Sequence, residues 1–308
     1  MTKELRSSLL LLVTAMIWGF AFVAQRVGMD YLEAFSYNAI RFALGSISLI
    51  PVIKYFGSSD KGENSKDNKQ VIKYGIIAGS ILFIAATLQQ IGLIYTTAAK
   101  AGFITTLYIV LVPIIGLFLK QKTNIHIWLG AIIATIGLYF LSIDENLTIQ
   151  FGDLLQLIGA VFWAIHIIVI GHFTRRVNSL KLSAMQFATC SVLSFIVAFI
   201  WEDIQLTNIL KAAVPILYGG IMSVGIAYSL QAVAQRHAKA SHAAIAMSME
   251  SVFAAIGGRL ILGERLPARG ILGCGLMFLG MLISQGENFN FKSIRASLSS
   301  TANLEERS

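Results

Sequence analysis

One acidic residue, Glu250, lies near the middle of a long apolar stretch that runs from residue 241 to residue 262. A carboxyl group there costs about 2.5–3.5 kcal/mol on membrane-insertion scales, so its presence needs a reason. At helical spacing it shares a face with four small residues, a kind that packs closely against neighbouring helices. These are Ala243, Ala246, Ala254 and Gly257. We therefore expect Glu250 to face the interior, either binding a substrate or proton or belonging to a structural hydrogen-bond network.

One basic residue, Arg41, lies within another apolar stretch, residues 35–54, on one helical face with Asn38. Because a guanidinium binds a carboxylate through two parallel hydrogen bonds, Arg41 can hold a substrate carboxylate or neutralise Glu250. We expect a gating or structural pair with Glu250, and direct contact with substrate is the alternative. Gln186 follows 145 residues later in a similar setting, so the arginine has no charged counterpart there.

Amphipathic side chains occur at helical spacing in further apolar stretches, an arrangement that suits a pathway for small amphiphilic molecules. Trp18 shares a face with Gln25, and Tyr228 shares one with Gln231. The other candidates for the same pathway are Gln90, Thr106, Tyr108, Trp163, His166 and Gln186. The alternatives are ordinary packing, a lipid-facing position for Trp18, and a hydrogen bond between helices for His166.

The sequence contains no pattern for metal, cofactor or nucleotide chemistry. It has no His-x-x-x-His pair or aspartate cluster, and Cys190 and Cys274 lie alone in separate apolar stretches, as buried structural thiols do. It also has no phosphate-binding G-x-x-x-x-G-K-[ST] loop, so ATP is not the expected energy source. We expect neither a cofactor nor a metal.

The elements that carry these residues are apolar segments of membrane length. Of the 308 residues, 56% are hydrophobic and 13% are charged, against about 25% charged in soluble domains. This composition predicts a membrane protein, and the net charge of +8, spread over short loops, does not indicate nucleic-acid binding. A helix needs about 20 apolar residues to cross the hydrocarbon layer. We predict ten transmembrane helices: 8–27, 35–54, 71–94, 99–119, 125–143, 154–172, 183–200, 212–235, 241–262 and 268–285.

The two halves of the chain repeat one another. Trp18 in A-M-I-W-G-F and Trp163 in A-V-F-W-A-I are 145 residues apart, and W-L-G-A-I-I-A-T-I-G from Trp128 matches I-L-G-C-G-L-M-F-L-G from Ile271. With five spans in each repeat, the second copy enters the membrane upside down, which is typical of secondary transporters. We therefore predict an all-α membrane protein built from two inverted five-helix repeats. The predicted units are the first repeat, the second repeat and a cytoplasmic tail, at 1–145, 146–290 and 291–308.

Most of the 24 Lys and Arg residues gather in connections on one side of the predicted helices. The positive-inside rule makes that side cytoplasmic. Because ten spans return the chain to the side where it began, we expect a multi-pass protein of the inner or plasma membrane with both termini in the cytoplasm. The longest connection on this side, the polar linker Gly57–Gln70, has no apolar surface to bury.

Five short motifs are spread over nearly the whole chain: W-G-F at Trp18–Phe20, R-F at Arg41–Phe42, T-T-L-Y-I-V-L-V-P at Thr105–Pro113, M-E-S-V-F-A-A at Met249–Ala255 and L-I-L-G-E at Leu260–Glu264. Together they resemble the EamA-type bacterial permeases of the drug/metabolite transporter (DMT) superfamily. Members typically have Glu-Pro in the ninth span, whereas Ser251 follows Glu250 here, so no proline can kink the span at that point. The resemblance implies a ten-helix inverted-repeat fold and movement of small metabolites, commonly outward.

We expect a secondary transporter, and more specifically an exporter, that moves small organic metabolites such as amino acids or drugs by alternating access. The expected partners are the small-molecule substrate and the lipid bilayer; a monomer suffices for an inverted repeat, and a homo-oligomer stays open. One alternative is an uncoupled facilitator of the same substrates. The other is an intramembrane lipid-modifying enzyme, which would need nucleophile–base or carboxylate–metal groupings that the loops lack. We do not expect an enzyme.

Overall fold

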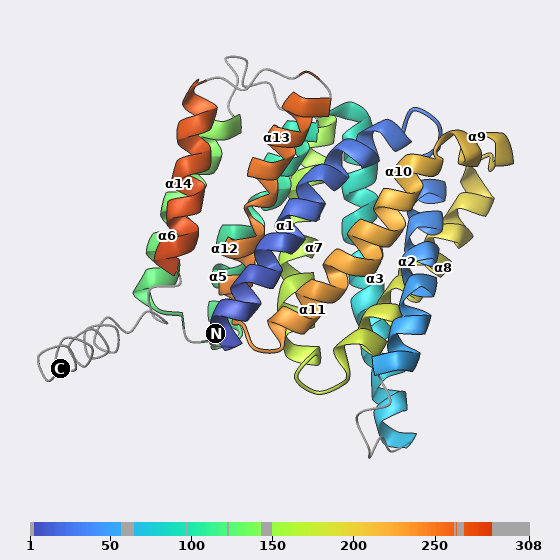
Figure 1. Ribbon diagram of the computed structural model, residues 1–308, viewed down its shortest axis with the longest axis horizontal. Helices are drawn as coiled ribbons and strands as arrows, with labels where there is room; N and C mark the ends of the chain where they lie inside the picture. The colour runs from blue at the N-terminus through green and yellow to red at the C-terminus, as the bar shows by residue number, and fades with distance from the viewer. Residues whose placement is uncertain are drawn as a thin grey trace, which may run out of the picture.

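The computed structural model describes residues 3–56, 65–96, 98–121, 123–142, 150–261, 263 and 268–284. Every regular element in these ranges is a helix, and the helices form one bundle (Figure 1), so the all-α prediction is confirmed. The tail predicted at 291–308 lies outside the described residues. Of the expected linker Gly57–Gln70, the part from Ser65 onward is helical, and the rest lies outside them as well.

The helices follow the predicted apolar segments. The first half contains α1 (Lys3–Gly28), α2 (Ala34–Phe56), α3 (Ser65–Tyr95), α4 (Ala98–Thr106), α5 (Tyr108–Phe118) and α6 (Ile125–Ser142). The second half contains α7 (Phe151–Phe173), α8 (Ser179–Trp201), α9 (Leu206–Lys211), α10 (Ala213–Leu217), the π-helical segment Tyr218–Tyr228, α11 (Ser229–Gln235), α12 (Ala240–Met247), α13 (Glu250–Ile261) and α14 (Ala268–Ser284).

Eight helical stretches in the described residues are long and apolar enough to cross a membrane. They coincide with eight of the ten predicted spans, so the chain is a multi-pass membrane protein. The segments predicted at 125–143 and 268–285 form shorter apolar helices, Ile125–Phe140 and Ala268–Ser284.

Two of the predicted spans are interrupted near their middle. The first breaks at Leu107, between α4 and α5, and the second breaks at Ser248 and Met249, between α12 and α13. Beside each break a hydroxyl donates to a carbonyl in the preceding turn: Thr106 to Gly102 at 2.6 Å and Ser248 to Ile245 at 2.7 Å. Such back-bonding competes with the helix's own hydrogen bonds. Thr135 and Thr189 make the same kind of bond inside the unbroken helices α6 and α8, so the bond accompanies each break without accounting for it.

The eighth predicted span also departs from a regular α-helix, because residues Tyr218–Tyr228 are π-helical. This segment contacts α2 closely. A Cβ on Gly219 would lie 2.8 Å from the Tyr37 hydroxyl, and a Cβ on Gly220 would lie 2.7 Å from a Leu44 methyl. Glycine therefore permits this approach, and the wider turn lies beside the candidate site described below, as π-helical turns often do.

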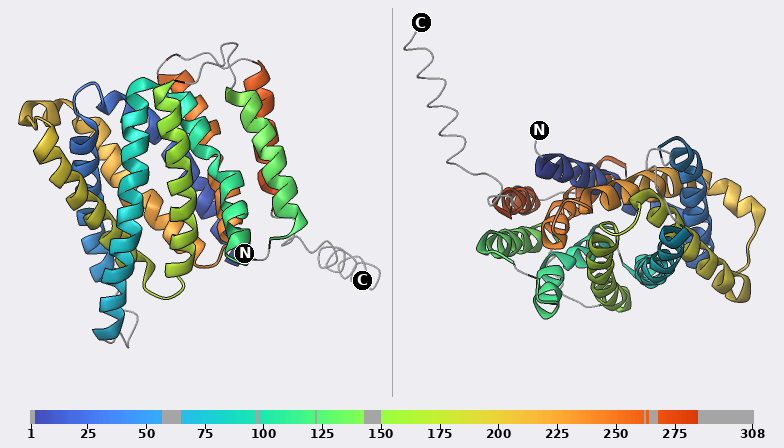
Figure 2. Two further views of the ribbon diagram at one scale, coloured as in Figure 1. Left: turned by 180° about the vertical axis from the view of Figure 1, so that it is seen from behind. Right: turned by 90° about the horizontal axis from the view of Figure 1, so that it is seen from below.

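The pair α6 and α14 stands side by side at one edge of the bundle (Figures 1 and 2). A Cβ on Gly130 would lie 2.6 Å from the Gly280 carbonyl oxygen, and a Cβ on Gly280 would lie 2.6 Å from that of Gly130. A Cβ on Gly137 would likewise lie 2.6 Å from the Gly273 carbonyl oxygen. Small residues thus bring the two backbones into direct contact, which is how helices associate without a hydrophobic driving force.

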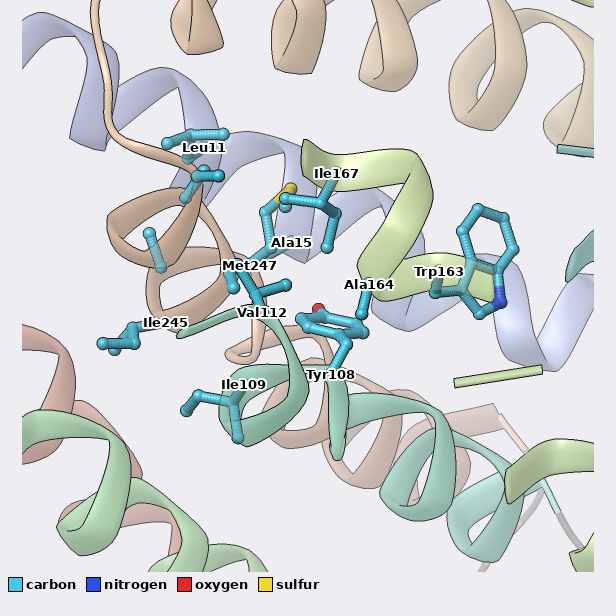
Figure 3. Packing of buried hydrophobic residues seen from close by; sticks show 14 of the residues in the cluster. Leu11, Ala15, Tyr108, Ile109, Val112, Trp163, Ala164, Ile167, Ile245 and Met247 are labelled. Carbon is cyan, nitrogen blue, oxygen red and sulfur yellow. The ribbon is translucent and has the colours of Figure 1, made fainter. Parts of the chain in front are cut away.

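The apolar core lies where α5, α7 and α12 meet α1. Figure 3 shows side chains of this cluster, among them Leu11, Ala15, Ile109, Val112, Ala164, Ile167, Ile245 and Met247. Tyr108 and Trp163 belong to the same cluster and carry polar atoms into it. The core therefore forms one wall of the candidate site.

Candidate functional site

Glu250 is the first residue of α13, directly after the break in the ninth predicted span, and its side chain is only 4% exposed. The Tyr108 hydroxyl donates a hydrogen bond of 2.8 Å to Glu250 Oε1, and the Thr106 hydroxyl donates a longer one of 3.5 Å. Thr106 also shares a hydrogen bond of 2.6 Å with the Ser251 hydroxyl. The two interrupted spans thus meet at their breaks, and hydroxyl groups join them around the buried carboxyl group.

Arg41 is 2% exposed and is positioned by its own helix, α2. Its Nε donates to Asn38 Oδ1 at 2.9 Å, and its guanidinium carbon lies 4.7 Å from the centre of the Phe42 ring. Within the described residues, Arg41 and Glu250 form no ion pair, and Arg41 Nη2 has no hydrogen-bond partner. The expected Arg41–Glu250 pair is therefore not present in this structure.

Arg41 and Glu250 nevertheless line one central cavity of about 30 Å³, room for about two water molecules. Seven of the predicted pathway residues line it: Trp18, Arg41, Tyr108, Trp163, Tyr228, Gln231 and Glu250. Thr106 reaches it through its hydrogen bond to Glu250. The sequence therefore identified most of this wall, and in this conformation the space is too small for an organic substrate.

Three predicted residues lie outside the cavity lining. His166 Nε2 and Gln186 Oε1 are 2.9 Å apart, so this pair links α7 to α8, as the alternative interpretation of His166 expected. The Gln90 side chain donates to the Gln25 carbonyl oxygen at 3.4 Å and links α3 to α1. All three side chains are buried, and their contacts are between helices.

Aromatic rings make up much of the cavity wall. The Tyr228 ring lies 4.5 Å from Trp18 and 6.2 Å from Trp163, measured between ring centroids. Trp18 Nε1 donates to the Ser223 carbonyl oxygen at 3.3 Å, in the π-helical segment. Trp163 Nε1, in contrast, has no acceptor in the part of the chain that the structure describes. The two tryptophans thus line the same cavity but differ in their hydrogen bonds.

Gln25, predicted on one face with Trp18, also lines the cavity, and five further residues line it without having been predicted: Phe22, Gln89, Thr105, Ile167 and Ser223. Gln89 Nε2 donates to Gln25 Oε1 at 3.2 Å, and the Thr105 hydroxyl donates to Gln156 Oε1 at 3.1 Å. Gln89 and Thr105 directly precede the predicted Gln90 and Thr106. The sequence thus indicated the two polar pairs, but in each pair the side chain that lines the cavity is one position earlier than the predicted one.

A larger hollow of about 520 Å³ lies between the ends of α5 and α7 and the start of α12. Its polar and charged lining comprises Gln121, Thr123, His172, Arg175, Lys239 and Ser241. Arg175 extends across this end and donates to the Ala238 carbonyl oxygen at 3.3 Å. The basic side chains place this hollow on the side where Lys and Arg residues gather in the sequence.

Groups that could hold a metal do not assemble in the described residues: no three or more His, Cys, Asp or Glu side chains come together. Cys190 is buried and Cys274 is half-buried, and neither is in a disulfide. The chemistry available at the cavity is therefore hydrogen bonding, charge and aromatic contact.

The sequence model of the EamA-like transporter family matches this chain twice, at residues 5–143 and 150–285. An uncharacterized transporter of Archaeoglobus fulgidus is 32% identical over 285 residues, covering 91% of this chain and 86% of that protein. The uncharacterized transporter YoaV of Bacillus subtilis is 23% identical over 276 residues, covering 87% and 93%. One solved crystal structure shares the fold, with a TM-score of 0.73 at 17% identity, and covers 90% of this chain and 96% of that one.

Proposed function

Because the chain belongs to the EamA-like transporter family, we propose that it is a secondary transporter that exports small organic metabolites, such as amino acids or drugs, by alternating access. The observation that carries this proposal is the central cavity, where a buried acid, a buried base and aromatic rings face one space inside a multi-pass bundle. Ionisable side chains at such a depth mark substrate or ion pathways in membrane proteins.

We further propose that ten spans form two inverted repeats, close to residues 1–145 and 146–290. The two matches to the family model, at 5–143 and 150–285, support this division. The contacts between α6 and α14 support it as well. Positions 143 residues apart correspond in the two repeats, so Gly130 corresponds to Gly273 and Gly137 corresponds to Gly280. The contact of Gly130 with Gly280 therefore corresponds to the contact of Gly273 with Gly137. Contacts that correspond in this way are those expected of a twofold relation between two halves.

The proposed orientation places both termini and the hollow of about 520 Å³ on the cytoplasmic side of the membrane, in keeping with the positive-inside rule. The hollow lies toward this side, whereas the central cavity of about 30 Å³ has no room for an organic molecule. This difference supports a cycle in which the helices around the cavity must separate to admit the cargo and close again behind it.

Glu250 is the proposed coupling group. It is buried, it accepts hydrogen bonds from Tyr108 and Thr106, and no basic side chain of the described chain pairs with it. A buried carboxylate without a cationic partner is costly, so a proton or a cationic group of the cargo is needed to offset its charge. Binding and release of that positive charge can then be linked to the opening and closing of the cavity.

The test is transport by the purified protein in liposomes, with labelled amino acids and cationic metabolites and with or without a pH gradient. Gradient-dependent uptake is expected, and Glu250→Gln should reduce it at least tenfold while cargo binding stays detectable. Glu33→Gln, at an exposed position, is the matched control and should transport normally. Full gradient-driven transport by Glu250→Gln contradicts the coupling role, and uptake that ignores the gradient identifies a facilitator.

A further inference from the structure

Three buried hydrogen-bond donors around the central cavity have no acceptor within the described residues. They are Arg41 Nη2, Trp163 Nε1 and Gln231 Nε2. They come from α2, α7 and α11, three helices far apart in the sequence, and all three residues line the same cavity. Their side chains are 2%, 7% and 1% exposed, so bulk water does not satisfy them.

Buried donors in proteins are nearly always paired, and an unpaired one is costly to keep. Here the surroundings hold two of them in place. The Arg41 guanidinium is fixed by Asn38, which accepts from Nε, and by the face of the Phe42 ring. The Trp163 indole stacks on Tyr228 at an interplanar angle of 24°. Donors held in this way are preorganised for an acceptor that the protein itself does not supply.

We propose that Arg41, Trp163 and Gln231 form a subsite for a carboxylate group of the transported molecule. The proposal rests on the transport function above and names the chemical class of the cargo. Because Nε is already bonded to Asn38, Arg41 Nη2 is the donor available for a carboxylate oxygen, and the indole and amide groups offer further donors to an anion in the same cavity.

The charge balance of the cavity favours a single negative charge on the cargo. Arg41 contributes one positive charge, Trp163 and Gln231 are neutral, and Glu250 lines the same space with an acidic group. Once a proton or a cationic group of the cargo offsets the charge of Glu250, as proposed above, Arg41 balances the single charge of a carboxylate but only half the charge of a doubly charged phosphate. The rings of Trp18, Phe22 and Tyr228 offer contact to an apolar remainder of the cargo.

Equilibrium binding to the purified full-length protein, without any gradient, tests this subsite. The probes are the proteinogenic amino acids together with benzoate and 3-phenylpropionate, each paired with its primary amide. The amide keeps the shape, removes the negative charge and replaces one acceptor oxygen with an NH2 donor. At least one acid should bind tenfold or more tightly than its amide, a difference of about 1.4 kcal/mol. Equal binding of acids and amides, or no binding of any acid, overturns the subsite.

Substitutions at two of the donor residues and at a control position show which side chains cause the preference for acids. Trp163→Phe removes Nε1 but keeps an aromatic ring, so it should reduce the acid-to-amide ratio several-fold. Trp201→Phe is the matched control, because Trp201 is 72% exposed at the end of α8. Arg41→Gln should remove the preference altogether. If Arg41→Gln does not fold, Trp163→Phe still decides: an unchanged ratio in a folded Trp163→Phe protein overturns the role of the indole.

Failure of this subsite and failure of the transport function give different results. Driven transport of a cargo that has no carboxylate, together with equal binding of acids and amides, rejects the subsite and leaves the transporter in place. Preferential binding of acids without flux of any of them supports the subsite and rejects transport of those acids.

Discussion

The two halves of the chain match the same family model and each contain one interrupted span, but they differ in chemistry. The fourth predicted span breaks at Leu107 and the ninth breaks at Ser248 and Met249, each beside a hydroxyl that bonds back to its own helix. At the point where the breaks meet, however, the first half supplies the hydroxyls of Thr106 and Tyr108, and the second half supplies the acid Glu250.

The same difference holds for the basic group. Arg41 of α2 is matched 145 residues later by Gln186 of α8, a neutral residue that bonds to His166. Each charged group of the cavity thus comes from one half only, Arg41 from the first and Glu250 from the second. The comparison teaches that helix breaks and cavity chemistry are separable: each half contains an interrupted span, and the charged groups of the cavity are distributed unequally between the halves.

The strongest way to break this asymmetry is to give the second half its own arginine. Gln186→Arg places a second, unpaired guanidinium at a position that is 1% exposed, and removes the bond to His166. We expect a loss of about 3 kcal/mol in stability, the scale of the cost of an unpaired charge inside a span. Thermal unfolding in detergent measures it. Gln121→Arg, at an exposed position, should have little effect, and equal stability of both variants would show that the centre accepts a second charge.

The close contact between the two halves is tested at the glycines of α6 and α14. In Gly280→Leu the new Cβ would lie 2.6 Å from the Gly130 carbonyl oxygen and 2.8 Å from the Ala134 backbone nitrogen. Because backbone atoms cannot move aside as a side chain does, the helices must separate, at a cost of about 1–3 kcal/mol. Gly275→Leu is the matched control on α14, since nothing lies within 4 Å of its Cβ. Similar unfolding temperatures for both variants would contradict the close contact.

The finest difference between the halves is found in the two matching tryptophans. Trp18→Phe and Trp163→Phe remove the same atoms, but only Trp18 Nε1 donates a hydrogen bond, to the Ser223 carbonyl oxygen. We expect Trp18→Phe to be the less stable variant by about 1 kcal/mol, the usual net value of one hydrogen bond. Parallel unfolding curves measure this difference, and the opposite order would show that the Ser223 contact does not stabilise the fold.

The sequence predicted the positions of the helices well, because membrane length and apolar character are local properties. The predicted segment 154–172 became α7, Phe151–Phe173, and 35–54 became α2, Ala34–Phe56. The breaks and the π-helical turn were not predicted. The π-helical turn lies against α2, and a contact between helices cannot be read from apolar composition.

The sequence predicted most of the residue types that line the candidate site, but not the contacts between them. Polar residues inside apolar stretches pointed to the cavity, but which helix lies beside which is a property of the whole bundle. The sequence therefore could not show that Glu250 bonds to Tyr108 and not to Arg41. Nor could it separate Gln89 from Gln90, because adjacent polar residues differ by about 100° around a helix and both faces were plausible.

The reciprocal glycine contact between α6 and α14 has a consequence for combined substitutions. Gly130 and Gly280 each leave room for the other's carbonyl oxygen, so both depend on one separation between the two helices. A leucine at either position pushes the helices apart, and the second leucine then enters space that the first has already opened. The free-energy costs of the two substitutions are therefore not additive, and the double variant loses less stability than the sum of the single ones.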